Sequence, residues 1–128
     1  MTKERILVAE DGRQQRAEIV ALLERMGFAE ILVATTAHEA IRMAMQSRPD
    51  IVVLDGLLPG MHGFEVARFI RNCDPTYQPR IIFMTAIYKN IRYQNEARLQ
   101  YGIDAYVIKP ITEIALCTAL SSGSTVAA

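Results

Sequence analysis

Five residues with metal-binding or reactive side chains stand directly after short apolar runs of this sequence. They are two adjacent carboxylates, a third carboxylate, a hydroxyl and an ammonium: Glu10, Asp11, Asp55, Thr85 and Lys109. If the three carboxylates lie together, their repulsion would raise a pKa, and a hard divalent cation with oxygen ligands would relieve it. Mg²⁺ suits a site with two or so carboxylates, several waters and a phosphate group.

The same residues are suited to covalent phosphate chemistry. A carboxylate such as Asp55 can act as a nucleophile and form an acyl phosphate. Charge that develops on phosphoryl oxygens needs cations and hydrogen-bond donors, which Lys109, the Thr85 hydroxyl and Mg²⁺ could supply. Neither histidine is placed as a base, and we interpret His38 and His62 as surface residues and not as metal ligands.

Five apolar runs must position these side chains, and segments of helical period separate them. The runs cover residues 6–9, 31–34, 51–54, 81–84 and 105–108. The alternation predicts an α/β fold, a single-domain doubly wound (βα)5 sandwich with a five-stranded parallel sheet. Right-handed crossovers bring the carboxyl ends of such strands to one edge, so the five polar residues should meet there.

Helix boundaries are marked by capping and turn residues. Gly27 should stop the first helix, Thr36 is a candidate N-cap for the second, and apolar spacing over 63–70 predicts the third. The fourth helical segment, 88–101, is more polar, and Ile91, Ala97 and Leu99 are its apolar members. Pro110 suits the first position of the fifth helix.

Composition limits the class of protein. The chain has 128 residues, of which 51% are hydrophobic, and 14 basic residues balance 14 acidic ones. These values predict one folded domain with no direct nucleic-acid or membrane surface. Cys73 and Cys117 have no metal or redox spacing, which favours reduced thiols in a cytoplasmic protein. We assign residues 1–120 to the domain and 121–128 to a tail or the start of a linker.

These motifs together resemble the receiver domain of two-component response regulators, a family whose stand-alone members include the bacterial chemotaxis regulator. The resemblance covers about residues 4 to 120. It rests on four motifs: Glu10-Asp11, Asp55-x-x-Leu-Pro-Gly-Met-x-Gly, Met84-Thr85-Ala86 and Tyr106-x-x-Lys109-Pro110. It implies a flavodoxin-like sheet of order 2-1-3-4-5.

The resemblance also implies a role for each residue of the site. Asp55 would accept a phosphoryl group from a histidine kinase or a histidine phosphotransfer protein, and Asp55, Thr85 and Lys109 are the candidate catalytic residues. Lys109 would pair with the phosphoryl oxygens. Thr85 would move to the phosphate and Tyr106 would swing inward behind it, so that these two residues form the switch. The bond between Lys109 and Pro110 would be cis.

Metal and partners follow from the same resemblance. Asp11, Asp55 and the backbone carbonyl of Leu57 would bind Mg²⁺ directly, and Glu10 would assist through water. No organic cofactor is implied. The surface of the fourth helix, fifth strand and fifth helix would signal to a downstream protein or a fused output domain. Such a domain promotes its own phosphorylation and dephosphorylation but is not a conventional metabolic enzyme.

Some residues depart from the family pattern. Leu57 and Ile87, two positions after Asp55 and Thr85, are apolar where many members have polar residues beside the path of the hydrolytic water. The stretch from Thr85 to Lys109 is slightly longer than expected for the family. It holds three tyrosines, which either form an interface or are scattered surface residues: Tyr88, Tyr93 and Tyr101.

Other interpretations remain for single residues and for the whole chain. Glu10-Asp11 could cap the first helix, Lys109 could be a solvated surface lysine, and Tyr106 could be a half-buried core aromatic. A flavin-binding module, an aspartate-nucleophile phosphatase and a receiver used only for docking are the alternative functions. An acidic first loop argues against the flavin module, a nucleophile on the third strand against the phosphatase, and a complete set of chemical residues against the docking module.

Overall fold

A computed structural model describes residues 2–86 and 91–121. Five parallel strands form one sheet in the order β2-β1-β3-β6-β7. Their bounds are Thr2–Ala9 for β1, Phe28–Ala34 for β2, Ile51–Asp55 for β3, Arg80–Thr85 for β6 and Ala105–Ile108 for β7. Each predicted apolar run lies within one of these strands, and the predicted doubly wound fold and strand order are confirmed.

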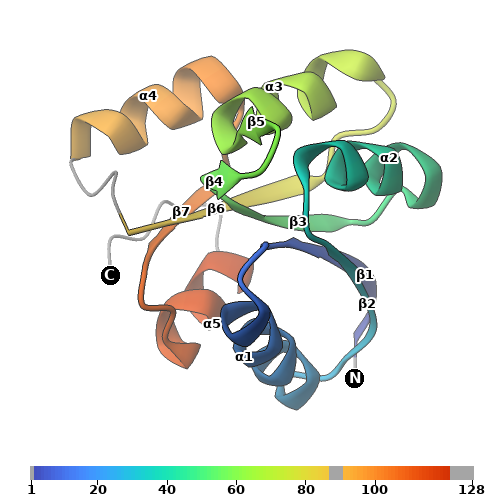
Figure 1. Ribbon diagram of the computed structural model, residues 1–128, viewed down its shortest axis with the longest axis vertical. Coiled ribbons are helices and arrows are strands. Elements are labelled where there is room, and N and C mark those ends of the chain that lie inside the picture. Colours follow the sequence, from blue (N-terminus) through green and yellow to red (C-terminus); the bar gives the residue numbers. More distant parts are fainter. Residues whose placement is uncertain (1, 87–90, 122–128) are drawn as a thin grey trace.

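Helices cover both faces of the sheet (Figure 1). They are α1 (Arg13–Arg25), α2 (Ala37–Ser47), α3 (Gly63–Cys73), α4 (Ile91–Tyr101) and α5 (Glu113–Ser121). Helices α1 and α5 pack on one face, and α2, α3 and α4 lie over the other. Successive residues of a strand point to opposite faces, so β1 supplies Leu7 to one core and Val8 to the other.

The helix boundaries test the capping predictions. The Thr36 side chain accepts a hydrogen bond from the backbone N–H of Glu39, which confirms it as the N-cap of α2. Gly27, with φ of 98°, follows the end of α1 as predicted. Pro110 does not start α5: the helix begins at Glu113, and the Thr112 hydroxyl accepts from the N–H of Ala115. The Lys109-Pro110 peptide bond is cis.

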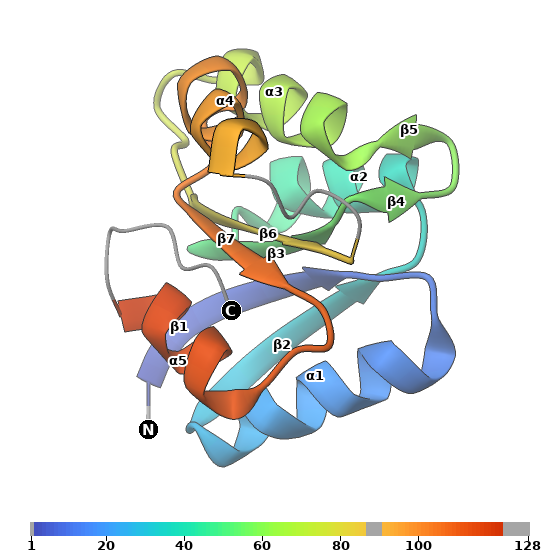
Figure 2. The same cartoon turned by 90° about the vertical axis from the view of Figure 1, so that its left-hand side faces the viewer.

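A short hairpin after β3 was not predicted. Strands β4 (Leu57–Leu58) and β5 (Met61–His62) pair in antiparallel fashion through a turn in which Gly60 has φ of 100°. Two-residue strands carry no periodic pattern, so the sequence indicated only a turn-rich loop here. In Figure 2 this hairpin and the start of α1 lie at the same edge of the sheet.

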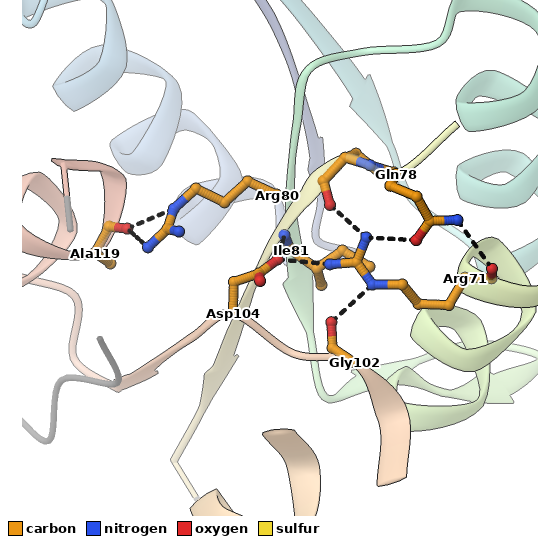
Figure 3. Close-up of polar contacts among 8 residues, drawn as sticks. Arg71, Gln78, Arg80, Ile81, Gly102, Asp104 and Ala119 are labelled. Carbon is orange, nitrogen blue, oxygen red and sulfur yellow. Dashed lines mark hydrogen bonds and ion pairs between the residues drawn. The ribbon is translucent and has the colours of Figure 1, made fainter. Parts of the chain in front are cut away.

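The opposite edge of the sheet is held by arginine hydrogen bonds (Figure 3). Arg71 of α3 donates to the carbonyls of Pro79 and Gly102 and to the carboxylate of Asp104, which also accepts from the N–H of Ile81. Arg80 donates twice to the carbonyl of Ala119 at the end of α5. These bonds join α3 and α5 to β6 and to the connections before β6 and β7, away from the predicted site.

The helices in the described part of the chain lack the length and apolar character of a membrane span. Leu99 of α4, one of the apolar residues of this more polar segment, is 87% exposed. Ile87, Tyr88 and the predicted tail beyond Ser121 lie outside the described residues.

Candidate functional site

The three carboxylates meet because β1 and β3 are neighbours in the sheet. Ala9 pairs with Leu54, so Glu10 and Asp55 follow side by side at the carboxyl edge. The ligand oxygens of Glu10, Asp11 and Asp55 all lie within 4.8 Å of one another. Glu10 and Asp55 are buried, whereas Asp11 is exposed. The buried pair and the exposed carboxylate together form an acidic site open to solvent.

Lys109 reaches this acidic group from the end of β7, the outermost strand on one side of the sheet. Its backbone N–H donates to the carbonyl of Thr85 over 2.8 Å, which fixes the chain beyond β7 against the end of β6. Its Nζ lies 2.8 Å from Glu10 Oε1 and 3.2 Å from Asp55 Oδ1. Lys109 is thus part of the site and not a solvated surface lysine.

Two glycines bring the loop after Asp55 close to its neighbours. The N–H of Gly56 donates to the carbonyl of Met84, and the N–H of Gly63 donates to the carbonyl of Gly56. A Cβ at Gly63 would lie 2.6 Å from the carbonyl oxygen of Asp55, closer than any real Cβ comes. The loop therefore folds back under Asp55, and the Leu57 N–H lies 3.5 Å from Asp55 Oδ1.

The environment shifts the pKa values of the two charged partners. Burial raises the pKa of Asp55, the charge of Glu10 raises it further, and the Lys109 ammonium opposes both effects. Burial alone would lower the pKa of Lys109, but its hydrogen bond to Glu10 and the charges of Asp55 and Glu10 outweigh burial and raise it. Lys109 therefore stays charged, while Asp55 carries an ionisation cost that a cation would relieve.

The site opens into a cleft of about 700 Å³. Its lining includes the predicted Leu57 and Thr85 beside the acidic residues and Lys109. Leu57 is half exposed at the mouth, and Thr85 is almost fully buried. A phosphoryl group could enter this cleft and meet Asp55, Lys109 and Thr85 together.

The donor set fits a hard divalent cation. Three carboxylates gather with one ammonium, and oxygen ligands of this kind are those that Mg²⁺ takes in phosphoryl-transfer sites. Both oxygens of Glu10 already accept hydrogen bonds, one from Lys109 and one from the N–H of Gly12. Asp11 and Asp55 are therefore better placed as direct ligands than Glu10.

Tyr106 lies in the core and not at the surface. Its side chain is fully buried, and its ring centroid lies 5.4 Å from that of Phe83. In this structure Tyr106 already has the inward position that the resemblance implies it would swing to. The alternative that Tyr106 is a half-buried aromatic is wrong. Phe83 in turn stacks on Phe64, and Phe64 stacks on Tyr101 of α4. Tyr101 thus packs within the molecule.

Several predicted alternatives for single residues can be decided. Helix α1 has Gly12 as its N-cap, and Glu10 Oε2 accepts a hydrogen bond from the backbone N–H of Gly12, so Glu10 contacts the start of this helix as well as Lys109. His38 is exposed on α2 and His62 caps α3 by accepting from the Phe64 N–H through Nδ1, and neither belongs to the acidic group.

Sequence reasoning missed two residues of α1 at this site. Gln15 accepts a hydrogen bond from Lys109 Nζ, and Arg16 donates to the backbone carbonyls of Glu10 and Asp11. Both lie at the start of the helix that follows the acidic pair, where a glutamine and an arginine have no distinctive pattern, so the sequence offered no specific signal for them.

Comparisons with known proteins agree with this geometry. The response regulator receiver domain family matches residues 6–121. The transcriptional regulatory protein AfsQ1 of Streptomyces coelicolor is 36% identical over 83% of the chain, which spans only 44% of that protein. Protein PilH of Pseudomonas aeruginosa is 26% identical, and the match covers 92% of the chain and 95% of PilH.

Solved structures give the same result. A LuxR-family two-component response regulator from Aurantimonas is 30% identical with a TM-score of 0.84, covering 98% of this chain and 91% of that one. The receiver domain of the sensor histidine kinase PA1611 from Pseudomonas aeruginosa, solved with magnesium in its active-site cleft, is 28% identical with a TM-score of 0.79, covering 93% and 95%. The chain therefore belongs to the response regulator receiver domain family, the phosphorylation-switched domains of two-component systems.

Proposed function

We propose that Asp55 is the phosphoryl acceptor of this receiver domain and that its donor is a phosphohistidine of a histidine kinase or histidine phosphotransfer protein. The observation that carries the proposal is the meeting of three carboxylates with the Lys109 ammonium, 3.2 Å from Asp55 Oδ1, in an open cleft. Asp55 is buried at the base of the site and lies beside the cation that phosphoryl oxygens need.

The transfer is a displacement at phosphorus. A carboxylate oxygen of Asp55 forms the new P–O bond while the P–N bond to the donor imidazole breaks, and the imidazole nitrogen keeps the electron pair. Lys109 pairs with a phosphoryl oxygen as charge develops there. The Thr85 hydroxyl, at the same edge of the sheet, donates a hydrogen bond to another.

The residues that would hold Mg²⁺ are Asp11, Asp55 and the backbone carbonyl of Leu57, with Glu10 acting through water. When bound, the ion offsets the negative charge of the carboxylates and of the phosphoryl oxygens. Glu10 contributes chiefly by fixing Lys109, since its Oε1 accepts from Nζ over 2.8 Å.

The output surface in this proposal is formed by α4, β7 and α5, and Thr85 and Tyr106 form the switch behind it. Large apolar side chains on this surface support an interacting partner: Leu99 is 87% exposed and Ile114 is 80% exposed. The partner is either a separate downstream protein or an output domain fused to the receiver, as the longer regulators among its relatives suggest. The domain then resets by hydrolysis of its own aspartyl phosphate.

The test is phosphorylation by acetyl phosphate, followed by the intact mass of the protein. We expect one phosphoryl group to be added in the presence of Mg²⁺, and none after chelation or in Asp55→Asn. Asp50→Asn is the matched control, because Asp50 directly precedes the same strand at its other end. Labelling that persists in Asp55→Asn, or that does not need Mg²⁺, would contradict the proposal.

A further inference from the structure

The Lys109 ammonium has a neutral hydrogen-bond acceptor besides its two carboxylates. Its Nζ lies 2.8 Å from Glu10 Oε1, 3.1 Å from Gln15 Oε1 and 3.2 Å from Asp55 Oδ1. An ammonium carries three N–H donors, so these acceptors match its full capacity. Gln15 comes from the first turn of α1, so this hydrogen bond links that helix to Lys109.

The residue at position 12 gives Gln15 the room for this contact. Gly12 has φ of −70° and ψ of 117°, a conformation open to any residue, so its backbone does not require glycine. A Cβ at this position would lie 3.2 Å from Glu10 Oε2 and 3.3 Å from Gln15 Oε1. Both distances are tighter than ordinary contacts, so a side chain at Gly12 would push against Gln15 Oε1, which accepts from Lys109, and against Glu10 Oε2, which accepts from the N–H of Gly12.

The neutrality of Gln15 matters because the site already holds three carboxylates. An amide oxygen can hold the ammonium without adding negative charge. A glutamate in its place would compete with phosphoryl oxygens for Lys109 and would repel an anionic donor. The chemistry of the site therefore favours an uncharged acceptor of this length.

We infer that Gln15 is a positioning residue for phosphoryl transfer: it holds the Lys109 ammonium beside Asp55, in a space that Gly12 keeps open. This inference rests on the proposed function of Asp55. Gln15 acts through Lys109, whose place relative to the phosphoryl oxygens decides how well their developing charge is stabilised. Loss of the contact should lower the rate of transfer more than the affinity for the metal.

The experiment compares Gln15→Met, which keeps the length but not the acceptor, with Gln15→Glu and Gly12→Ala. Gln46→Met is the matched control, because Gln46 is exposed on α2, away from the site. Initial rates of phosphorylation are measured by intact mass over a range of acetyl phosphate concentrations at saturating Mg²⁺. Mg²⁺ titration and the ¹⁵N resonance of Lys109 Nζ are recorded for each variant.

Gln15→Met should lower the rate at saturating acetyl phosphate by roughly two- to tenfold, the range for one lost hydrogen bond. Its affinity for Mg²⁺ should stay near that of the wild type, and its Lys109 Nζ resonance should shift. Gly12→Ala should shift the same resonance, Gln15→Glu should be slower than Gln15→Met, and Gln46→Met should change nothing.

Three results would overturn the inference alone. The first two are wild-type rates in Gln15→Met and an equal loss of rate in Gln46→Met. The third is an unshifted Nζ resonance in Gln15→Met, because the lost rate would then have another cause. A wild-type protein that takes no phosphoryl group, or labelling that persists in Asp55→Asn, would instead overturn the proposed function and this inference with it.

Discussion

Asp55 combines a reactive role with an unfavourable environment. It is buried beside Glu10, and its pKa is raised by burial and by that neighbouring charge, in spite of Lys109. A raised folded pKa means that the ionised carboxylate is less stable in the folded chain than in the unfolded one. A bound divalent cation would offset this cost, and cation binding is part of the proposed function.

Asp55→Asn is therefore predicted to stabilise the metal-free domain at pH 7. The free energy of folding lost to the ionised Asp55 side chain is zero below its unfolded pKa of about 4. This loss grows between the unfolded and the folded pKa and is complete above the folded pKa. The variant should melt roughly 2–6 °C above the wild type at pH 7, and the gap should narrow toward pH 4. Thermal unfolding followed by circular dichroism over this pH range is the measurement.

Mg²⁺ provides the control for this prediction. It should raise the melting temperature of the wild type by mass action and that of Asp55→Asn much less. Asp50→Asn should not gain stability, because the Asp50 carboxylate accepts the N–H of Arg5. A metal-free Asp55→Asn protein that melts below the wild type at pH 7 would show that the Lys109 contact outweighs burial and Glu10.

Leu57 is predicted to prolong the phosphorylated state. It lines the cleft and is 52% exposed, and an apolar side chain cannot orient the water that attacks the aspartyl phosphate. Leu57→Asn should shorten the lifetime of the aspartyl phosphate by up to about tenfold. One positioned polar group commonly changes the rate of such chemistry by more than that, but the effect should be smaller here because the cleft is open to solvent.

The lifetime is timed as phosphate release after removal of acetyl phosphate. Leu57→Met, which is apolar and of similar size, should decay like the wild type. Equal decay of Leu57→Asn and the wild type would mean that a partner or the site geometry sets the lifetime. The matching prediction for Ile87 concerns a residue outside those that the structure describes.

At the scale of elements, the carboxyl edge of the sheet and the opposite edge have different roles. The carboxyl edge carries the cleft, and the opposite edge carries the Arg71 cluster that joins α3, the chain before β6 and the chain before β7 (Figure 3). The Arg71 side chain is 17% exposed, so its bonds are shielded from solvent. Stability and chemistry should therefore be separable by mutation.

Arg71→Met is predicted to lower the free energy of unfolding by about 2–4 kcal/mol, because two carbonyls and the Asp104 carboxylate lose a charged donor. Urea denaturation measures this, with Arg68→Met, an exposed residue of the same helix, as the control. Below its melting temperature the Arg71→Met protein should be phosphorylated at the wild-type rate. A slower rate would mean that the cluster also shapes the cleft.

Elements with strong patterns were predictable and those set by tertiary contacts were not. The strands were found because each contains a continuous apolar run, and Thr36 was found because a hydroxyl before a helix is a local signal. The start of α5 was misplaced because the chain continues past Pro110 before the Thr112 hydroxyl caps the helix, which begins at Glu113. The hairpin β4–β5 depends on the close approach of Gly63 to Asp55, which no local pattern reveals.

The site was predictable to the extent that parallel topology determines it. Asp55, Glu10 and Lys109 had to meet once their strands were parallel and in this order. Gln15 escaped notice because a glutamine in a helix has no pattern of its own, and its contact with Lys109 depends on how α1 packs. Tyr106 was expected to move inward, but its burial is already complete in this structure.

At the scale of the whole molecule, the hydrogen bond from the Lys109 N–H to the Thr85 carbonyl joins the site to β7. Displacement of either residue toward a phosphoryl group should therefore reach β7 and the helices beside it. Because Tyr106 is buried already, the larger changes should come from Thr85 and Lys109. Such a change is a shift between two packings of one fold, driven by the new charge.

This coupling predicts the response to beryllofluoride, a mimic of the phosphoryl group. With Mg²⁺, it should shift backbone NMR signals of α4, β7 and α5 in the wild type. In Thr85→Ala the shifts should stay near Asp55, because the hydroxyl that draws β6 toward the group is missing. If the shifts spread equally far in the wild type and in Thr85→Ala, Lys109 alone would couple the site to α4, β7 and α5.

The central claim is that Asp55 carries the phosphoryl group. Borohydride reduces an aspartyl phosphate to homoserine, so fragmentation of the peptide that contains Asp55 can locate the modified residue after treatment with acetyl phosphate and Mg²⁺. The account predicts homoserine at position 55 and at no other acidic residue, with none formed when Mg²⁺ is chelated. Homoserine at position 11, or a phosphoryl group retained on a histidine, would contradict it.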